Sequence, residues 1–336
     1  MARMTTGAQL VAALPLQLGF TPSESLVIVC CHEPRGRVGL TLRIDLPVEA
    51  LEVDLVDSLV GRVRHEQATR VALAVYTEQG GTMPRQHLVD DLRLQLGDLV
   101  LTEALLVRSG RFWSYVCSDP RCCPTEGRSI EEAAGSSPVQ LLAMQNVLAG
   151  RSVLPDRAAV AASLAGPTFL VAEVARQCCQ QAGAAFDNEM LTLGAPVGQA
   201  LGLQRWRAAV DRFGSPPAML DEQDAARLAM TLHSKAVRDD VATWVADDEQ
   251  PLLALVGELC RRTPAPYDAP VATLLGWLSY AVGGGAVVVI ALERALTTDP
   301  DYELARLLLD LSSAQVRPAA VRAMLAQEAR RTQWAS

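Results

Sequence analysis

The sequence has very little lysine and few aromatic residues. Lys235 is the only lysine among 30 basic residues, and aromatic residues make up 4% of the 336-residue chain. Because 50% of the residues are hydrophobic, a largely disordered chain is excluded, and the core must be built mainly from alanine, leucine and valine. The length suits one large domain or two ordinary ones. Such a uniform preference for arginine is typical of GC-rich coding rather than of many separate functional choices.

The sequence also lacks an excess of positive charge. Its 30 basic and 38 acidic residues give a formal net charge of −8. A protein that binds nucleic acid in general needs a basic surface, so we expect no nucleic-acid partner. The common glycine-rich nucleotide motifs, the zinc-protease motif and the serine-hydrolase motif are absent as well. Whether the chain is an enzyme therefore stays open.

A secretion signal is not evident near the first residue. Pro15, Gln17 and Gly19 interrupt the apolar stretch there, and no small-residue cleavage pattern follows it. We therefore expect a cytoplasmic protein. In that compartment, the eight cysteines are expected to be thiols or metal ligands rather than disulfides.

The first part of the chain alternates strand and helix patterns. Strands are predicted over residues 25–32, 37–45, 71–76, 99–107 and 111–115, and helices over 51–63, 86–96 and 140–148. The first two strands can form a hairpin, and the helix after them indicates a crossover within a mixed sheet. We predict an α/β domain over residues 1–150, with a mixed sheet and flanking helices.

From residue 156 onward, the strand patterns nearly disappear. Helices are predicted over 156–164, 173–182, 197–213, 222–245 and 252–261, with breaks at glycine and proline that include Gly183. We therefore predict a mostly α-helical domain over residues 151–336. We expect this helical domain to present its surface to a partner protein.

A run without any charged residue extends from Ala269 to Leu292. Its 24 residues would be long enough to span a bilayer, but three consecutive glycines at 283–285 interrupt it. Gly276, Gly283 and Pro300 fall at the spacing of a tetratricopeptide-type pair of antiparallel helices. We predict a closely packed helical hairpin here and no membrane partner.

The densest group of reactive side chains follows the last predicted strand. Cys117, Cys122 and Cys123 lie within seven residues, among several charged residues. Loops at strand ends often carry ligand sites in α/β proteins. The candidate catalytic residues of this segment are Cys117, Asp119, Arg121, Cys122, Cys123 and Glu126.

Three interpretations of this segment stay open. The three cysteines can supply thiolates to zinc, with His32, His65, His87 or another cysteine as fourth ligand, although their C-x4-C-C spacing differs from that of zinc ribbons. Alternatively, Arg121 and Arg128 can lower the pKa of one thiol, and a neighbouring thiol can resolve its sulfenate. In the third interpretation, the segment is a turn in which small cysteine side chains only fill buried space.

Three segments resemble a known protein family. Residues 113–127 carry the pattern W-S-Y-x-C-x-D-P-x-C-C-P-x-E-G, and residues 291–305 and 18–27 carry weaker patterns. The chain thereby resembles a family of uncharacterised actinobacterial proteins that share a domain of unknown function. The resemblance supports the architecture and fits the arginine preference, and it implies no activity. Residues 281–285 depart from it, because a more polar turn ending in Gly-Asp is expected there.

Two functions from different classes follow. The first is an interaction or regulatory protein that acts through its helical domain. The alternative is a thiol-based redox enzyme or a metal-binding sensor centred on residues 117–123, with zinc as the metal.

Overall fold

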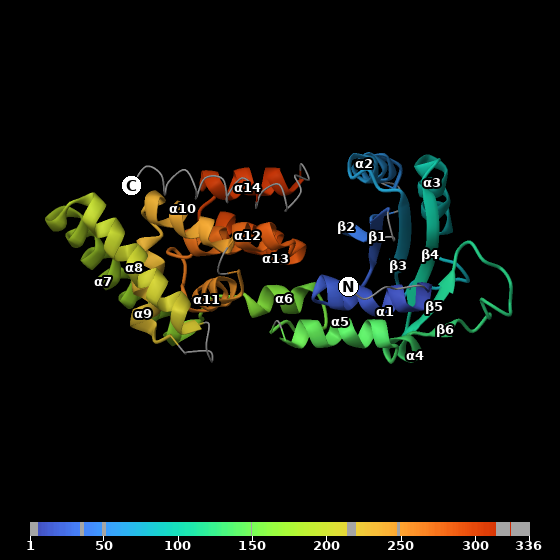
Figure 1. The fold of residues 1–336 in the computed structure, drawn as a ribbon, viewed down its shortest axis with the longest axis horizontal. Helices are drawn as coiled ribbons and strands as arrows, with labels where there is room; N and C mark the ends of the chain where they lie inside the picture. Colours follow the sequence, from blue (N-terminus) through green and yellow to red (C-terminus); the bar gives the residue numbers. More distant parts are fainter. Residues whose placement is uncertain are drawn as a thin grey trace. The chain divides into compact units, whose positions relative to one another are not determined.

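The computed structural model describes residues 6–33, 37–48, 52–148, 150–213, 220–246, 249–313 and 323. The chain divides into two compact units, Met1–Arg157 and Ala158–Ser336. Unit 1 contains a mixed sheet with flanking helices, and the described part of unit 2 is mostly helical (Figure 1). The predicted fold class is therefore confirmed.

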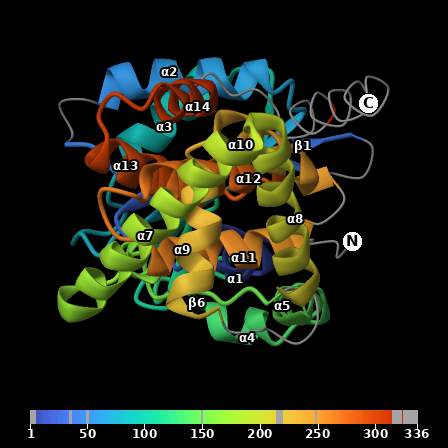
Figure 2. The ribbon, with the colours of Figure 1, turned by 90° about the vertical axis from the view of Figure 1, so that its left-hand side faces the viewer.

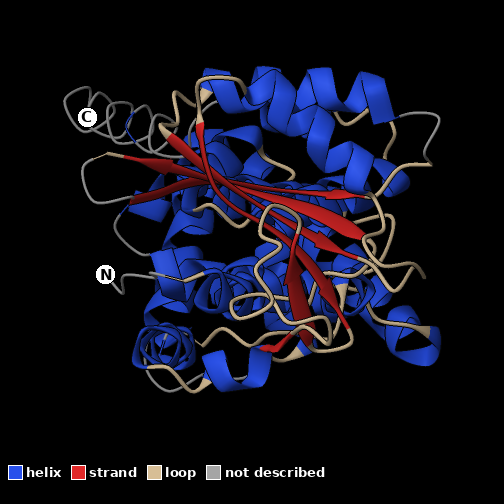
Figure 3. Cartoon of the chain, turned by 90° about the vertical axis from the view of Figure 1, so that its right-hand side faces the viewer, coloured by secondary structure: helices blue, strands red, loops and turns tan. Residues whose placement is uncertain are grey.

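Within the described residues, the sheet of unit 1 has six strands in the order β2-β1-β3-β4-β5-β6. Figure 3 draws the strands of this sheet in red. They are β1 (Ser25–His32), β2 (Arg37–Asp45), β3 (Arg70–Tyr76), β4 (Val100–Arg108), β5 (Arg111–Ser114) and β6 (Arg128–Ser129). Strands β3 and β4 are parallel, and the other neighbouring pairs are antiparallel. The predicted hairpin of β1 with β2 is present, and the chain crosses over from β2 to β3, which lies on the other side of β1.

Helices cover both faces of this sheet because its central strands are apolar on both sides. Val71, Leu73 and Val75 of β3 pack with α2 (Glu52–His65) and α3 (Gln86–Leu96). The alternate residues Ala72 and Ala74 pack with α1 (Gly7–Leu18) on the opposite face. Helices α4 (Ile130–Ala134) and α5 (Ser137–Leu148) adjoin α1.

Helix α1 was not predicted from the sequence, and Pro15 lies in its interior. Capping explains how it forms nonetheless. The Thr6 hydroxyl accepts a hydrogen bond from the N–H of Gln9 at 3.2 Å, and Gly19 ends the helix at a φ of 79°. Val11 and Leu14 are then buried against the sheet, which stabilises the helix through tertiary packing.

Unit 2 is built from successive helices (Figure 2). They are α6 (Arg157–Ser163), α7 (Phe169–Leu193), α8 (Ala195–Phe213), α9 (Glu222–Thr231), α10 (Lys235–Thr243), the short 3-10 helix η2 (Trp244–Ala246), α11 (Glu249–Arg262), α12 (Ala269–Val282), α13 (Gly285–Thr298) and α14 (Glu303–Ser313). Two predicted boundaries were wrong. Gly183 lies inside α7, where a Cβ would come 3.0 Å from Met230 Cε, so this glycine permits close packing rather than ending the helix. The single helix predicted over 222–245 is interrupted between α9 and α10.

The uncharged run forms the predicted helical hairpin of α12 and α13. Gly283 turns the chain at a φ of 87°, and a Cβ on Gly276 would lie 2.7 Å from Leu292 Cδ2. Most side chains of α12 are buried, and so are five of α13, among them Val288 and Leu292, which accounts for the lack of charge. Among the helices of the described residues, none combines the length and the apolarity needed to cross a membrane.

Candidate functional site

The three cysteines of the motif lie on the long loop that joins β5 to β6. The loop leaves the sheet after Ser114 and returns at Arg128, where Phe112 and Arg128 are paired across the two strands. In Figure 1 it extends beyond the edge of the sheet. The closing end of the loop is therefore fixed to a strand, while its tip is open to solvent.

Side chains from the sheet hold the returning half of the loop. Trp113 Nε1 donates to the carbonyl of Thr125 at 3.0 Å, and Arg111 donates to the carbonyls of Glu126 and Gly127 at 2.7 Å each. Gly127 has a φ of 73°, and a Cβ on it would lie 2.5 Å from the Trp113 ring. The indole ring therefore packs directly on the backbone of Gly127, where a larger residue does not fit.

Hydrogen bonds from two motif residues shape the tip of the loop. Ser114 Oγ accepts from the N–H of Cys117 at 3.1 Å. The carbonyl of Asp119 accepts from the N–H of Cys122 at 3.0 Å and from that of Cys123 at 2.7 Å. These bonds close the turn and bring residues 122 and 123 back toward Cys117.

The turn brings the three thiols together. The Sγ atoms of Cys117, Cys122 and Cys123 all lie within 4.8 Å of one another. Cys122 is exposed, whereas Cys117 and Cys123 are half-buried. Within the described ranges, this cluster contains no histidine and no fourth cysteine. The site therefore offers three sulfur ligands and a side that is open to solvent.

The three thiols differ in their electrostatic environment. The backbone N–H of Asp119 and then the Cys123 thiol donate to Cys117 Sγ and lower the pKa of Cys117. Burial, followed by hydrogen bonding with the neighbouring thiols, raises the pKa of Cys123. Cys117 therefore ionises first of these two, and Cys123 acts as a donor to it.

The charged candidates of the motif lie outside the sulfur cluster. Arg121 pairs with the Asp119 carboxylate at 3.0 Å, and the Arg128 guanidinium lies over the ring of Phe112, 5.8 Å from its centre. The backbone carbonyl of Glu126 binds Arg111. The lowered pKa of Cys117 therefore comes from a backbone N–H and the two neighbouring thiols, and the two arginines are engaged elsewhere.

The histidines suggested as a fourth ligand also have other surroundings. His32 Nε2 lies 2.9 Å from a carboxylate oxygen of Glu66, and His87 Nε2 lies 2.5 Å from one of Glu52. His65 is the last residue of α2. None of the three belongs to the sulfur cluster, so a fourth ligand would come from outside the described residues or from solvent.

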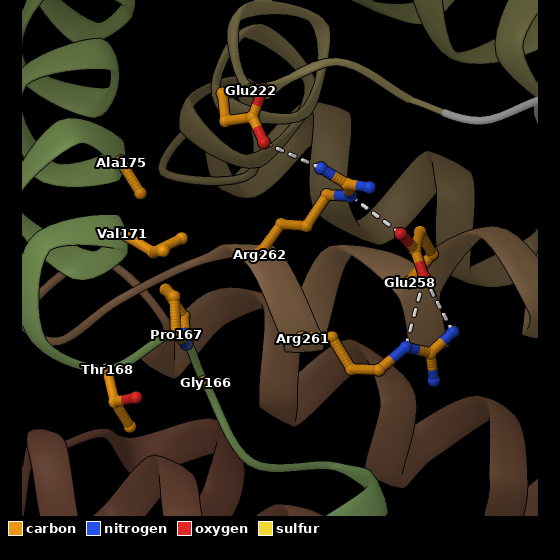
Figure 4. Close-up of a pocket in the computed structure, with 9 residues that line it drawn as sticks. All are labelled: Gly166, Pro167, Thr168, Val171, Ala175, Glu222, Glu258, Arg261 and Arg262. Atoms are coloured by element: carbon orange, nitrogen blue, oxygen red, sulfur yellow. Dashed lines mark hydrogen bonds and ion pairs between the residues drawn. The ribbon is translucent and has the colours of Figure 1, made fainter.

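Two polar clusters were not anticipated from the sequence. The carboxylate of Glu52 is buried in unit 1 between Arg85 and His87. A pocket of about 360 Å³ in unit 2 is lined by Pro167 and Val171 on one side and by the paired side chains of Glu222, Glu258, Arg261 and Arg262 on the other (Figure 4). The pairs of Glu52 with Arg85 and of Glu222 with Arg262 join residues far apart in the sequence, so no local motif marks them. The pairs of Glu258 with Arg261 and Arg262 lie at i,i+3 and i,i+4 spacing within α11, which is a local signal that could have found them.

Comparison with known proteins places the whole arrangement in one family. No curated protein and no solved structure matches the chain. The match to a family model extends over residues 8–319, so it includes the thiol loop and most of both units. The chain belongs to the family described as a domain of unknown function (DUF4192).

Proposed function

We propose that the loop of residues 114–127 binds a thiophilic metal ion, with zinc as the first candidate, and that the protein acts as a metal-binding sensor. The observation that carries the proposal is the convergence of three Sγ atoms within 4.8 Å. A tetrahedral zinc ion with Zn–S bonds of about 2.3 Å places its sulfurs about 3.8 Å apart. Small side-chain rotations in the loop are therefore enough to bring all three sulfurs to one ion.

The surrounding hydrogen bonds support a built site rather than a chance contact. Ser114 and Asp119 each bind backbone N–H groups of the cysteines, and Trp113 and Arg111 fix the returning half of the loop. Partners that orient the ligands of a metal are a regular part of metal sites. With three protein ligands, one coordination position faces solvent, which is the arrangement of zinc sites that exchange a fourth ligand.

The test is metal binding by the reduced full-length chain. Titration with Cd²⁺ should produce sulfur-to-metal charge-transfer absorption that saturates at one ion per chain, and elemental analysis should give one zinc after loading. Cys117→Ser, Cys122→Ser and Cys123→Ser should each weaken binding by at least about tenfold, since each removes one of three ligands.

Cys178→Ser is the matched control, because Cys178 is also a half-buried free thiol but lies on α7. This variant should bind the metal as the unchanged chain does. Equal affinity in all four variants, or no charge-transfer absorption in the unchanged chain, would rule out the site.

A second proposed function concerns the partner protein expected for the helical unit. The first turns of α7 carry four exposed apolar side chains, among them Phe169 at 92% and Leu170 at 83% exposure, followed by Val171 and Val174. Phe169 also has a φ of 52°, an uncommon backbone conformation for a bulky residue. Contiguous exposed apolar residues of this kind often mark protein contacts.

The partner proposed for this patch is a second copy of the chain, because a two-fold axis brings the same apolar patch of two copies together. Light scattering after size-exclusion chromatography should show a dimer. Phe169→Asp combined with Leu170→Asp should give a monomer. Leu191→Asp, at an equally exposed leucine of the same helix, should leave the dimer intact. A monomeric unchanged chain at all concentrations would contradict this assignment.

A further inference from the structure

The covalent geometry of the thiol cluster restricts how its cysteines can bond. Three thiols within 4.8 Å define three pairs: 117 with 122, 117 with 123, and 122 with 123. The last pair is adjacent in sequence. A disulfide between adjacent cysteines closes a small ring that contains their peptide bond, and the planar trans peptide fits such a ring poorly. Two favourable pairs remain, and Cys117 belongs to both.

The backbone of the loop is already folded for either of these pairs. The N–H groups of Cys122 and Cys123 share the carbonyl of Asp119 as acceptor, which places both residues opposite Cys117 across one tight turn. Cys122 is exposed, and the other two thiols are half-buried, so a small oxidant reaches the cluster from solvent. A thiol that is accessible and next to a second thiol is the usual arrangement of a redox-sensing cysteine pair.

From this geometry we propose that the loop is a peroxide-responsive switch in which Cys117 forms a disulfide with either Cys122 or Cys123. In the first step, one thiolate of the pair attacks an oxygen of hydrogen peroxide. The S–O bond forms, the O–O bond breaks, and hydroxide leaves and becomes water by taking up a proton. In the second step, the other thiol attacks the sulfur of this sulfenic acid, the S–S bond forms, the S–O bond breaks, and the leaving hydroxide takes up the thiol proton and departs as water. The protein loses two hydrogen atoms, and the peroxide is reduced to two waters.

The switch has a consequence for the metal site. A disulfide removes two of the three sulfur ligands, so oxidation should release a bound ion. This release step rests on the metal-binding function proposed above, whereas disulfide formation in the metal-free protein does not.

The adjacency of Cys122 and Cys123 gives the switch a distinctive pattern among variants. In Cys122→Ser, the disulfide should form between Cys117 and Cys123, and in Cys123→Ser between Cys117 and Cys122. In Cys117→Ser, the loop should form no disulfide, although it keeps two thiols. A metal site that needs all three ligands would instead lose binding in every one of these variants.

The experiment treats the reduced, metal-free full chain with a stoichiometric amount of hydrogen peroxide. Free thiols are then alkylated, and disulfides are located by mass spectrometry of peptides. The expected result is a disulfide from Cys117 in the unchanged chain, in Cys122→Ser, in Cys123→Ser and in the control Cys178→Ser. Circular dichroism checks that every variant is folded.

Two results would overturn the switch. One is a disulfide between Cys122 and Cys123 that forms in Cys117→Ser as fast as disulfides form in the unchanged chain. The other is a reduced loop in every variant after peroxide treatment.

Zinc release is followed separately with a chromogenic chelator. If the reduced chain binds no zinc and the disulfide still forms, the metal proposal fails and the switch stands. If zinc binds and no disulfide forms, the switch alone fails.

Discussion

At the scale of single residues, the motif is explained by what each side chain does for the loop. Trp113 packs on Gly127, Ser114 binds the N–H of Cys117, and Asp119 turns the chain back. The cysteines contribute their backbone N–H groups to these bonds, and their Sγ atoms lie within 4.8 Å of one another. The residues around the cysteines therefore shape the loop, and the three sulfurs are brought together by it.

Gly127 tests whether the residues around the cysteines shape the loop. Gly127→Ala places a Cβ 2.5 Å from the Trp113 ring, at a φ of 73° that disfavours any side chain. We expect a loss of about 1–3 kcal/mol in the free energy of unfolding and at least about tenfold weaker Cd²⁺ binding. Thermal unfolding and metal titration measure the two effects.

Gly110 provides the control, since it has the same φ of 73° and a Cβ added there would meet no atom within 4 Å. Gly110→Ala should cost only the backbone strain and should leave metal affinity unchanged. Equal metal affinity of Gly127→Ala and Gly110→Ala would show that the Trp113 contact does not position the thiols.

A second residue-scale prediction concerns the carboxylate of Glu103. It accepts a hydrogen bond from the backbone N–H of Gly7, and its partial burial raises its pKa above the ordinary value of 4.5. A carboxylate with a raised pKa in the folded state binds protons more tightly there than in the unfolded state. Its contribution to stability is present below the ordinary pKa and is lost as the pH rises through the raised one.

Glu103→Gln keeps an oxygen that can accept from Gly7 and removes the charge. We expect this variant to be more stable than the unchanged chain at pH 7, by less than about 1 kcal/mol because solvent screens the half-buried group. The two proteins should converge near pH 4 in denaturant unfolding. A difference of the same size at both pH values would contradict the burial argument.

At the scale of helices and strands, apolar periodicity predicted most of the fold. Strands β1 to β5 and helix α3 lie within about two residues of their predicted bounds, because β-branched runs and leucines at helical spacing are local signals. The two-residue strand β6 carries no such signal and was not predicted. The errors at α1 and at Gly183 share one cause. Pro15 and Gly183 are read locally as breaks, whereas burial against the sheet and close packing on Met230 decide the outcome.

The candidate site could be predicted only in part for the same reason. The spacing of the cysteines drew attention to the loop, but their convergence depends on the carbonyl of Asp119 and the hydroxyl of Ser114. Hydrogen bonds of this kind leave no periodic pattern in the sequence. The ion pairs of Glu52 with Arg85 and of Glu222 with Arg262 depend on contacts between distant segments and were not predicted.

The prediction for this scale concerns the close packing of α12 against α13. Gly276→Ala places a Cβ 2.7 Å from the buried Leu292, so the two helices must separate or Leu292 must move. We expect a loss of about 1–3 kcal/mol in the free energy of unfolding.

Gly257→Ala on α11 is the control, because the atom nearest to the added Cβ lies 3.9 Å away, at the end of the flexible Arg261 side chain. There we expect a gain of up to about 1 kcal/mol from helix propensity. Denaturant unfolding measures the change in the free energy of unfolding for both variants. Equal changes would contradict the close contact between Gly276 and Leu292.

At the scale of the whole molecule, the division into two units assigns the thiol site to one of them. Every hydrogen bond described for the loop joins residues of unit 1, and both hydrophobic clusters that flank the sheet consist of residues from that unit. A unit of 157 residues with its own core lies within the usual size range of an independently folding domain. The site should therefore not require the helical unit.

This leads to a prediction for the fragment Met1–Arg157. Expressed alone, it should unfold cooperatively in denaturant, and it should bind one Cd²⁺ with an affinity within about threefold of that of the full chain, because no metal ligand is removed. Cys117→Ser in the fragment supplies a folded control without the site. A fragment that unfolds cooperatively but has lost metal binding would mean that unit 2 contributes to the site. A fragment without a cooperative transition would mean that unit 1 needs unit 2 to fold, and the two units would then have to be treated as one folding unit.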